Sequence, residues 1–173
     1  MKFKFPYDKG HIDATIDDKN VAAVLVSKAE TYKASLGQKE LVEKSLDEPI
    51  GSPSLEELVK GKKDVTIISS DHTRPVPSHI TMPILLRRIR AAEPNIKISI
   101  LVATGFHRAS THEELVNKYG EEIVKNENII MHDSKNDADM VRIGTLPSGG
   151  ACIVNKAAVN AELLIAEGFI EPH

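Results

Sequence analysis

The chain has 173 residues, enough for one domain with a substantial core, and a formal net charge of -3. Its basic residues form no stripe, and aromatic residues make up only 4% with no tryptophan, which argues against nucleic-acid binding. No apolar stretch reaches the length of a membrane span. The single cysteine, Cys152, excludes an internal disulfide, so we expect a cytoplasmic protein in which Cys152 is a small buried residue.

The first thirty residues have the pattern of antiparallel strands, at residues 2–7, 11–16 and 21–26, with turn-forming residues at 17–20. A helix is predicted over residues 38–46. The Ser-x-x-Glu spacing of a capping box, at Ser54 and Glu57, predicts the start of another. We therefore expect a small N-terminal β segment over residues 1–30, followed by helices.

From residue 64 the chain alternates between apolar runs and amphipathic stretches. Residues 65–70 and 98–104 are continuous apolar runs, typical of strands buried on both faces of a parallel sheet. The helix between them can be capped by Ser78. Because Pro83 is tolerated only in a first turn, we expect the helix to begin nearer Thr81.

The second half continues the alternation. Ser110 and Glu113 have capping-box spacing, and the helix that follows is interrupted at Gly120. Further elements are expected as strands at residues 129–132 and 141–144, a turn at 146–150, a short helix at 155–160 and a last strand at 163–168. This order predicts an α/β fold, a mainly parallel sheet with helices on both faces, whose motif-bearing core spans residues 64–173.

Ionisable residues follow three of the predicted strands, and ligands of open α/β sheets bind beyond the carboxyl ends of strands. After the first, Arg74 has the planar fork that grips a carboxylate or phosphate, and Asp71 can orient it or bind a ribose hydroxyl. The alternative is an ion pair within the loop. After the second strand comes His107, which is either a general acid/base or a partner of the next helix's N-terminus. After the third comes His173.

Other common sites are not indicated. The remaining histidines have no paired metal-ligand spacing, so no self-contained metal site is predicted. No Gly-x-Gly-x-x-Gly or Walker-type loop occurs, and Ser69 and Ser70 lack the glycines of a nucleophile elbow.

Three short motifs, in order and at matching spacing, carry a resemblance to a known family. They are residues 71–77 (DHTRPVP), 103–108 (ATGFHR) and 167–173 (EGFIEPH). In these motifs the chain resembles the nickel-pincer lactate racemase family, over roughly residues 65–173.

The resemblance implies an isomerase that interconverts D- and L-2-hydroxy acids, lactate in the first instance, by hydride transfer. It implies a nickel-pyridinium-3,5-bisthiocarboxylic acid mononucleotide as the cofactor. Carried over by position, His107 and His173 match the paired acid/base histidines. The residues that match the cofactor-binding loop are Asp71, His72, Thr73 and Arg74.

The resemblance also implies partners outside this sequence. The cofactor-attachment lysine and the nickel-ligand histidine of the family lie just past His173, as does a second domain. We therefore expect this chain to be the N-terminal part of a larger two-domain enzyme that depends on cofactor-making accessory proteins, and to be inactive by itself. Two alternatives remain open: a racemase or epimerase of another 2-hydroxy acid, and a non-catalytic nucleotide- or anion-binding module.

Overall fold

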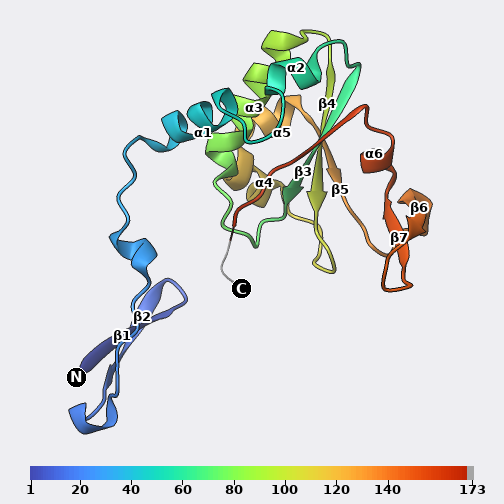
Figure 1. The fold of residues 1–173 in the computed structure, drawn as a ribbon. Helices are drawn as coiled ribbons and strands as arrows, with labels where there is room; N and C mark the ends of the chain where they lie inside the picture. Colours follow the sequence, from blue (N-terminus) through green and yellow to red (C-terminus); the bar gives the residue numbers. More distant parts are fainter. Residues whose placement is uncertain (171–173) are drawn as a thin grey trace. The chain divides into compact units, whose positions relative to one another are not determined.

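The computed structural model describes residues 1–170, the side chain of Glu30 apart, and divides the chain into two compact units, Met1–Ser35 and a second that begins at Leu36. In the first unit β1 (Lys2–Tyr7) pairs antiparallel with β2 (Gly10–Thr15) (Figure 1). Short 3-10 turns follow at Asp18–Asn20 and Lys28–Thr31.

The predicted third strand of this unit, over residues 21–26, is wrong. No strand is formed there, and Val24, Leu25 and Val26 are 53%, 94% and 62% exposed. The apolar run has the composition of a strand, but it pairs with neither β1 nor β2, which pair only with each other in the described residues. The N-terminal β segment is therefore a single hairpin.

A parallel sheet of four strands forms the centre of the second unit, in the order β5-β4-β3-β8 (Figure 1). The strands are β3 (Asp64–Ser70), β4 (Lys97–Ala103), β5 (Asn128–Met131) and β8 (Leu163–Ala166). Their runs of valine, isoleucine and leucine suit burial on both faces. The predicted α/β fold with a mainly parallel sheet is confirmed.

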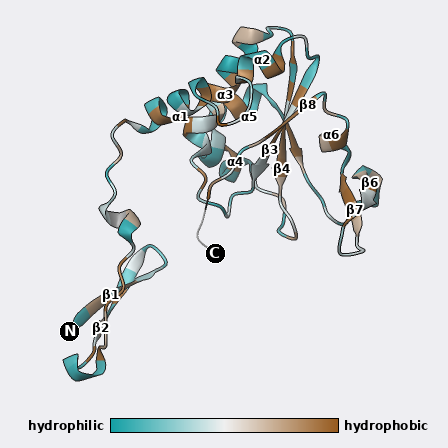
Figure 2. Ribbon diagram, viewed as in Figure 1, coloured by the Kyte–Doolittle hydropathy of each residue, from teal (hydrophilic) through white to brown (hydrophobic). Residues whose placement is uncertain are grey.

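Helices cover one face of this sheet and enclose the main core. They are α1 (Gln38–Asp47), α2 (Leu55–Val59), α3 (Ser78–Ala92), α4 (His112–Tyr119) and α5 (Glu121–Asn126). The fully buried Ile67 and Ile100 of the sheet pack with Val59, Met82 and Ile89 of the helices. Figure 2 shows apolar residues on the central strands, and apolar and polar residues alternating along these helices.

The N-terminus of α4 is capped one residue later than predicted. The Thr111 hydroxyl accepts a hydrogen bond from the Glu114 amide, and the Glu114 carboxylate accepts from the Thr111 amide. The capping box predicted at Ser110 and Glu113 is therefore wrong. Both spacings satisfy the pattern, and the Ser110 hydroxyl is instead hydrogen-bonded to His72.

Helix α3 begins at Ser78 rather than near Thr81, so the expected effect of Pro83 on its start is wrong. The carbonyl of Pro77 accepts from the Thr81 amide, which closes the first turn ahead of the proline. Pro83 then lies in the second turn, where it withholds one amide, the one that would bond the His79 carbonyl. The predicted Ser78 cap is also wrong, since Pro77 is the capping residue and makes no side-chain hydrogen bond.

The other face of the sheet carries the short helix α6 (Lys156–Val159) and a hairpin of β6 (Met140–Thr145) and β7 (Ala151–Asn155). Strand β7 was not predicted. It pairs only with β6 in the described residues and does not join the main sheet. Cys152 lies on it and is only partly buried, contrary to expectation.

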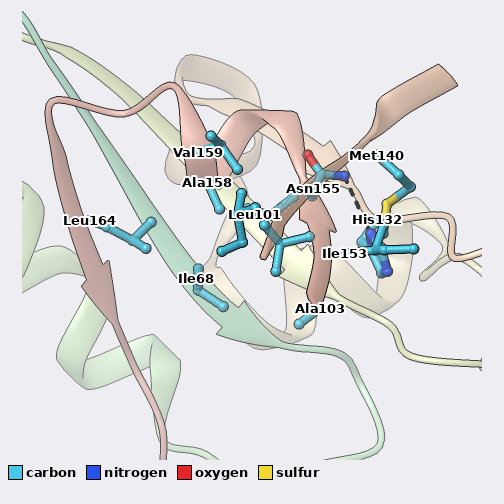
Figure 3. A pocket seen from close by; sticks show the side chains of 12 residues that line it. Ile68, Leu101, Ala103, His132, Met140, Ile153, Asn155, Ala158, Val159 and Leu164 are labelled. Atoms are coloured by element: carbon cyan, nitrogen blue, oxygen red, sulfur yellow. Dashed lines mark hydrogen bonds between the residues drawn. The ribbon is translucent and has the colours of Figure 1, made fainter. Parts of the chain in front are cut away.

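Between this hairpin, α6 and the sheet lies an apolar hollow of about 570 Å³ (Figure 3). Ile68 and Leu101 of the sheet face it, Ile153 and Val159 line the other side, and His132 and Asn155 are hydrogen-bonded at one end. Among the described residues, no helix is long and apolar enough to cross a membrane.

Candidate functional site

Strand register brings the exits of β3, β4 and β8 to one edge of the sheet. Ser70 of β3 lies opposite Ala103 of β4, and Ile68 lies opposite Ala166 of β8. The residues that follow these strands therefore meet in a crevice of about 490 Å³. Its polar lining comprises Ser69, Ser70, Asp71, Arg74, Thr104, His107 and Glu167.

A short hydrogen bond in the crevice joins Asp71 to His107. The Asp71 Oδ2 atom lies 2.5 Å from His107 Nδ1. Asp71 is 2% exposed whereas the His107 side chain is 48% exposed, so a buried carboxylate holds an accessible ring. When Nδ1 donates to the carboxylate, the second nitrogen, Nε2, keeps its lone pair free for a proton. This arrangement suits a general base.

Thr73 holds the other oxygen of the same carboxylate. Its amide and its hydroxyl donate to Asp71 Oδ1 at 3.0 and 2.6 Å. Burial raises the pKa of the Asp71 carboxyl, but the hydrogen bonds from Thr73 and His107 outweigh this effect, and the pKa lies below its ordinary value. Asp71 is thus held as an anion.

A tight turn sets the position of the histidine. The His107 amide donates to the Thr104 carbonyl at 2.9 Å, and Gly105 inside the turn has φ of +58°. A side chain at this backbone conformation is strained, so the glycine permits the turn. Thr104 is itself anchored, since its hydroxyl donates to the His132 carbonyl at 2.5 Å.

Arg74 lines the crevice without an ion-pair partner among residues 1–170, and it is exposed. The predicted pairing of its side chain with Asp71 is wrong. The hydrogen bond between the two residues is from the Arg74 backbone amide to the Asp71 backbone carbonyl, at 3.4 Å. The Asp71 carboxylate is instead hydrogen-bonded to Thr73 and His107. The guanidinium therefore remains available to an anionic ligand.

His72 contacts residues other than Asp71 and His107. Its Nδ1 lies 2.9 Å from the Ser110 hydroxyl and its Nε2 lies 3.5 Å from Glu114. Both contacts tie the loop after β3 to the N-terminus of α4. His72 also lines a second, smaller pocket, which Arg74 shares with the crevice.

Two charged residues at the site carried no role in the sequence interpretation. Glu167 accepts hydrogen bonds from the hydroxyls of Ser69 at 2.7 Å, Ser78 at 3.0 Å and Thr81. Lys118 of α4 is 9% exposed and donates to the Ser70 hydroxyl at 3.3 Å. Glu167 opens the third motif, which was the available signal. Lys118 had none, because only the apolar positions of its helix form a pattern.

His173, predicted as the second acid/base, lies outside the described residues, so its convergence with His107 stays a prediction. Within residues 1–170, no group of three or more His, Cys, Asp and Glu side chains is arranged to hold a metal ion.

The comparisons with known proteins converge on one family. Residues 7–173 match the model of the lactate racemase N-terminal domain. A lactate racemase of Lactiplantibacillus plantarum is 67% identical over 168 residues, and that of Thermoanaerobacterium thermosaccharolyticum is 48% identical over 170 residues. The chain is covered to 97% and 98% in these matches, but it spans only 40% of the length of either relative.

Solved structures agree with these matches. The structure of the lactate racemase apoprotein from Thermoanaerobacterium thermosaccharolyticum superposes with a TM-score of 0.90 at 46% identity, over 100% of this chain and 40% of that one. A Thermotoga maritima protein superposes with a TM-score of 0.58 at 23% identity, over 74% of this chain and 32% of that one, which supports the fold alone.

Proposed function

Because the chain belongs to the lactate racemase N-terminal domain family, we propose that it forms part of an enzyme that interconverts D- and L-lactate. The observation that carries this proposal is the Asp71–His107 pair in the same crevice as Arg74, which has no ion-pair partner among residues 1–170. A 2-hydroxy acid requires a base for its hydroxyl proton and, beside it, a guanidinium that binds its carboxylate.

In the proposed reaction His107 Nε2 accepts the proton of the substrate hydroxyl while the α-hydrogen leaves with its bonding electron pair as a hydride. The product of this half-reaction is the 2-keto acid, with a proton now on His107. Asp71 keeps the ring oriented throughout, and the Arg74 guanidinium binds the substrate carboxylate. Return of the hydride to the opposite face of the keto acid gives the other enantiomer.

The second enantiomer needs a base on the other side of the substrate, because its hydroxyl points the opposite way. We assign this role to His173, which matches the family motif and lies beyond the described residues. Substrates with larger side chains, such as malate or phenyllactate, remain a variant of the same proposal.

The residues present fit the implied nickel-pincer mononucleotide. The crevice of about 490 Å³ combines the Arg74 guanidinium, which has no ion-pair partner in the described part of the chain, with hydroxyl and carboxyl groups. The guanidinium suits the carboxyl and phosphate groups of a nucleotide, and the hydroxyl and carboxyl groups suit its ribose. We propose that Asp71, His72, Thr73 and Arg74 form the loop that holds it. When bound, this cofactor supplies the hydride acceptor and donor. Since the family's attachment lysine and nickel ligand follow residue 173, we expect the 173-residue chain alone to be inactive.

The test uses the full-length parent protein, produced together with the accessory proteins that make the cofactor. Purified parent is expected to convert D-lactate to a racemic mixture, measured by enantiomer-specific oxidation of the product. His107→Asn should lower kcat by roughly 10²–10⁴-fold, the usual contribution of a general base. Arg74→Lys, which keeps the charge but loses the fork, should mainly raise KM.

A matched control is His112→Asn, an exposed histidine in the first turn of α4 with no contact to the crevice, which should leave kcat unchanged. Loaded parent that leaves lactate untouched but racemises another 2-hydroxy acid would correct the substrate. Parent that acts on no 2-hydroxy acid would favour the anion-binding module. A cytoplasmic location stays a prediction, carried by the single cysteine.

A further inference from the structure

We propose that the pocket on the other side of the loop after β3 is a binding site for a phosphate monoester dianion. The pocket has a volume of about 380 Å³ and adjoins the crevice through Arg74. Its lining includes His72, Arg74, His79, Asn117 and Lys118, with Glu114 as the one acidic residue among those described. The site stands on its own geometry. Naming a cofactor phosphate as its occupant rests on the proposed function.

Lys118 is the central observation. Its side chain is buried to 9% exposure, yet it makes no ion pair among residues 1–170, and its one hydrogen bond is the 3.3 Å contact to the Ser70 hydroxyl. An ammonium has three donors, so two remain unused. Burial lowers the pKa of Lys118, although the charges of Glu167 and Asp71 act in the opposite direction. A buried cation without a paired anion is costly, and a bound anion would remove that cost.

The one carboxylate in the pocket does not cancel this positive charge. Glu114 accepts two hydrogen bonds from Arg108, at 2.8 and 2.6 Å, and a third from the Thr111 amide at 2.7 Å. The bonds from Arg108 are the main cause of a pKa of about 2 for Glu114. Because Arg108 neutralises Glu114, the charges of Lys118 and Arg74 are left facing the pocket.

The start of α3 adds a weaker contribution. His79 lies in the first turn of this 15-residue helix, whose N-terminus has no side-chain cap. The amides of Ser78, Ile80 and Thr81 already donate to the carbonyls of Val76 and Pro77, so it is the positive end of the helix dipole that favours an anion. The helix start only supplements the two cations that line the cavity.

The charge of the lining selects the ligand class. Two fixed cations with imidazole and amide donors match a phosphate monoester, which carries close to two negative charges at pH 7 and three acceptor oxygens. A carboxylate carries one charge and would leave one of the cations uncompensated. The phosphate could belong to a nucleotide cofactor that extends from the crevice past Arg74, or it could be free inorganic phosphate.

The experiment titrates the 173-residue chain itself with three probes: nicotinic acid mononucleotide, nicotinic acid riboside without the phosphate, and inorganic phosphate. Binding is followed by calorimetry and by NMR of the His72 and His79 ring protons. We expect the mononucleotide to bind and to shift both rings, and the riboside to bind at least tenfold more weakly. Lys118→Met should weaken binding of the mononucleotide by about tenfold or more.

Two variants control for folding and for non-specific charge. Lys125→Met removes an exposed lysine of α5 and should change the affinity less than twofold. Lys118→Arg restores the charge and should recover part of the binding that Lys118→Met loses. Thermal unfolding shows whether each variant is folded before it is titrated.

The outcomes separate this site from the racemase proposal. Tighter binding of the mononucleotide than of inorganic phosphate supports a cofactor phosphate, and equal binding supports free phosphate as the occupant. Equal binding of the riboside and the mononucleotide, or unchanged affinity in folded Lys118→Met, overturns the site. A parent protein that racemises nothing while its pocket still binds phosphate would overturn only the proposed function.

Discussion

Replacing Asp71 by asparagine should reverse the proton position on the His107 ring. Asp71 Oδ1 accepts two hydrogen bonds from Thr73, and Oδ2 accepts one from His107. An asparagine has only one acceptor oxygen. Turned toward Thr73 it keeps two bonds, and turned toward His107 it keeps one, so the first orientation is favoured. The amide NH₂ then faces His107 Nδ1, which must become the acceptor while Nε2 carries the proton.

The same change has a cost in stability. The Asp71 side chain is 2% exposed. Its carboxylate accepts three charge-assisted hydrogen bonds from the protein in place of those that water would donate in the unfolded chain. Such bonds contribute about 1.5–3 kcal/mol each at most, but Thr73 and the half-exposed His107 can turn to water in the variant. We expect Asp71→Asn to lose about 2 kcal/mol, which corresponds to a fall in Tm of roughly 4–8 °C for a chain of this size.

The loss should depend on pH. The folded state holds the pKa of Asp71 below its ordinary value of 3.8. A carboxyl with a lowered pKa stabilises the fold fully above its unfolded pKa, and that stabilisation disappears as the pH falls through the folded pKa. Asparagine does not titrate. The stability gap between the native chain and Asp71→Asn should therefore be full at pH 6–7 and shrink below about pH 4.

Two measurements on the 173-residue chain check this reasoning. Urea unfolding at pH 7 and pH 3 gives the two stability gaps, and ¹⁵N chemical shifts of the imidazole nitrogens at neutral pH identify the tautomer of His107. An Asp71→Asn chain whose His107 still carries its proton on Nδ1 would refute the acceptor count. A stability gap of the same size at both pH values would refute the charge-assisted bonding.

Three further predictions concern single features of the fold. Gly105→Ala should lower the free energy of unfolding by about 1–2 kcal/mol, because Gly105 has a φ of +58°. Gly168→Ala should be neutral, since Gly168 also has open space around it but no positive φ. Equal losses in the two variants would refute the argument from backbone strain. Tyr119→Phe should be neutral or stabilising by about 0.5–1 kcal/mol, since burial raises the pKa of Tyr119 to about 12 and its hydroxyl makes no hydrogen bond of good geometry among the described residues. A loss above about 1 kcal/mol would instead show that the nearby Ser69 hydroxyl bonds it. The apolar hollow of Figure 3 should bind an apolar fluorescent dye, and Leu164→Ser should reduce that fluorescence while Leu25→Ser, at a 94% exposed leucine outside the hollow, should not.

The fold was predictable where a single element carries its own signal. The apolar runs of β3 and β4 have no polar alternation, so their burial in a parallel sheet follows from composition alone. The errors occurred where a choice depended on distant residues. Both Ser110 and Thr111 satisfy the capping-box pattern, and the contact of Ser110 with His72, 38 residues earlier, decides between them.

The candidate site was predictable in position but not in pairing. Strand exits gave Asp71, Arg74 and His107, because parallel strands end at one edge. That Asp71 holds His107 rather than Arg74 depends on the register that sets Ser70 beside Ala103, and no local pattern contains this register. Lys118 was missed for a related reason. A lysine on an amphipathic helix is normally solvated, and the burial of this one depends on residues distant in the sequence, among them Ser70 at the end of β3.

Arg74 couples the two cavities on either side of its loop, since it lines both the crevice and the phosphate-sized pocket. The crevice holds the carboxyl groups of Asp71 and Glu167, whereas the pocket holds Lys118 together with Glu114, which is paired with Arg108. The exposed Arg74 guanidinium can hydrogen-bond a substrate carboxylate and a phosphate together only if both ligands lie close to it. The effects of Arg74→Lys and Lys118→Met on binding of a mononucleotide should therefore be non-additive, as expected for neighbours that share a ligand. Additive losses would mean that Arg74 serves the crevice alone.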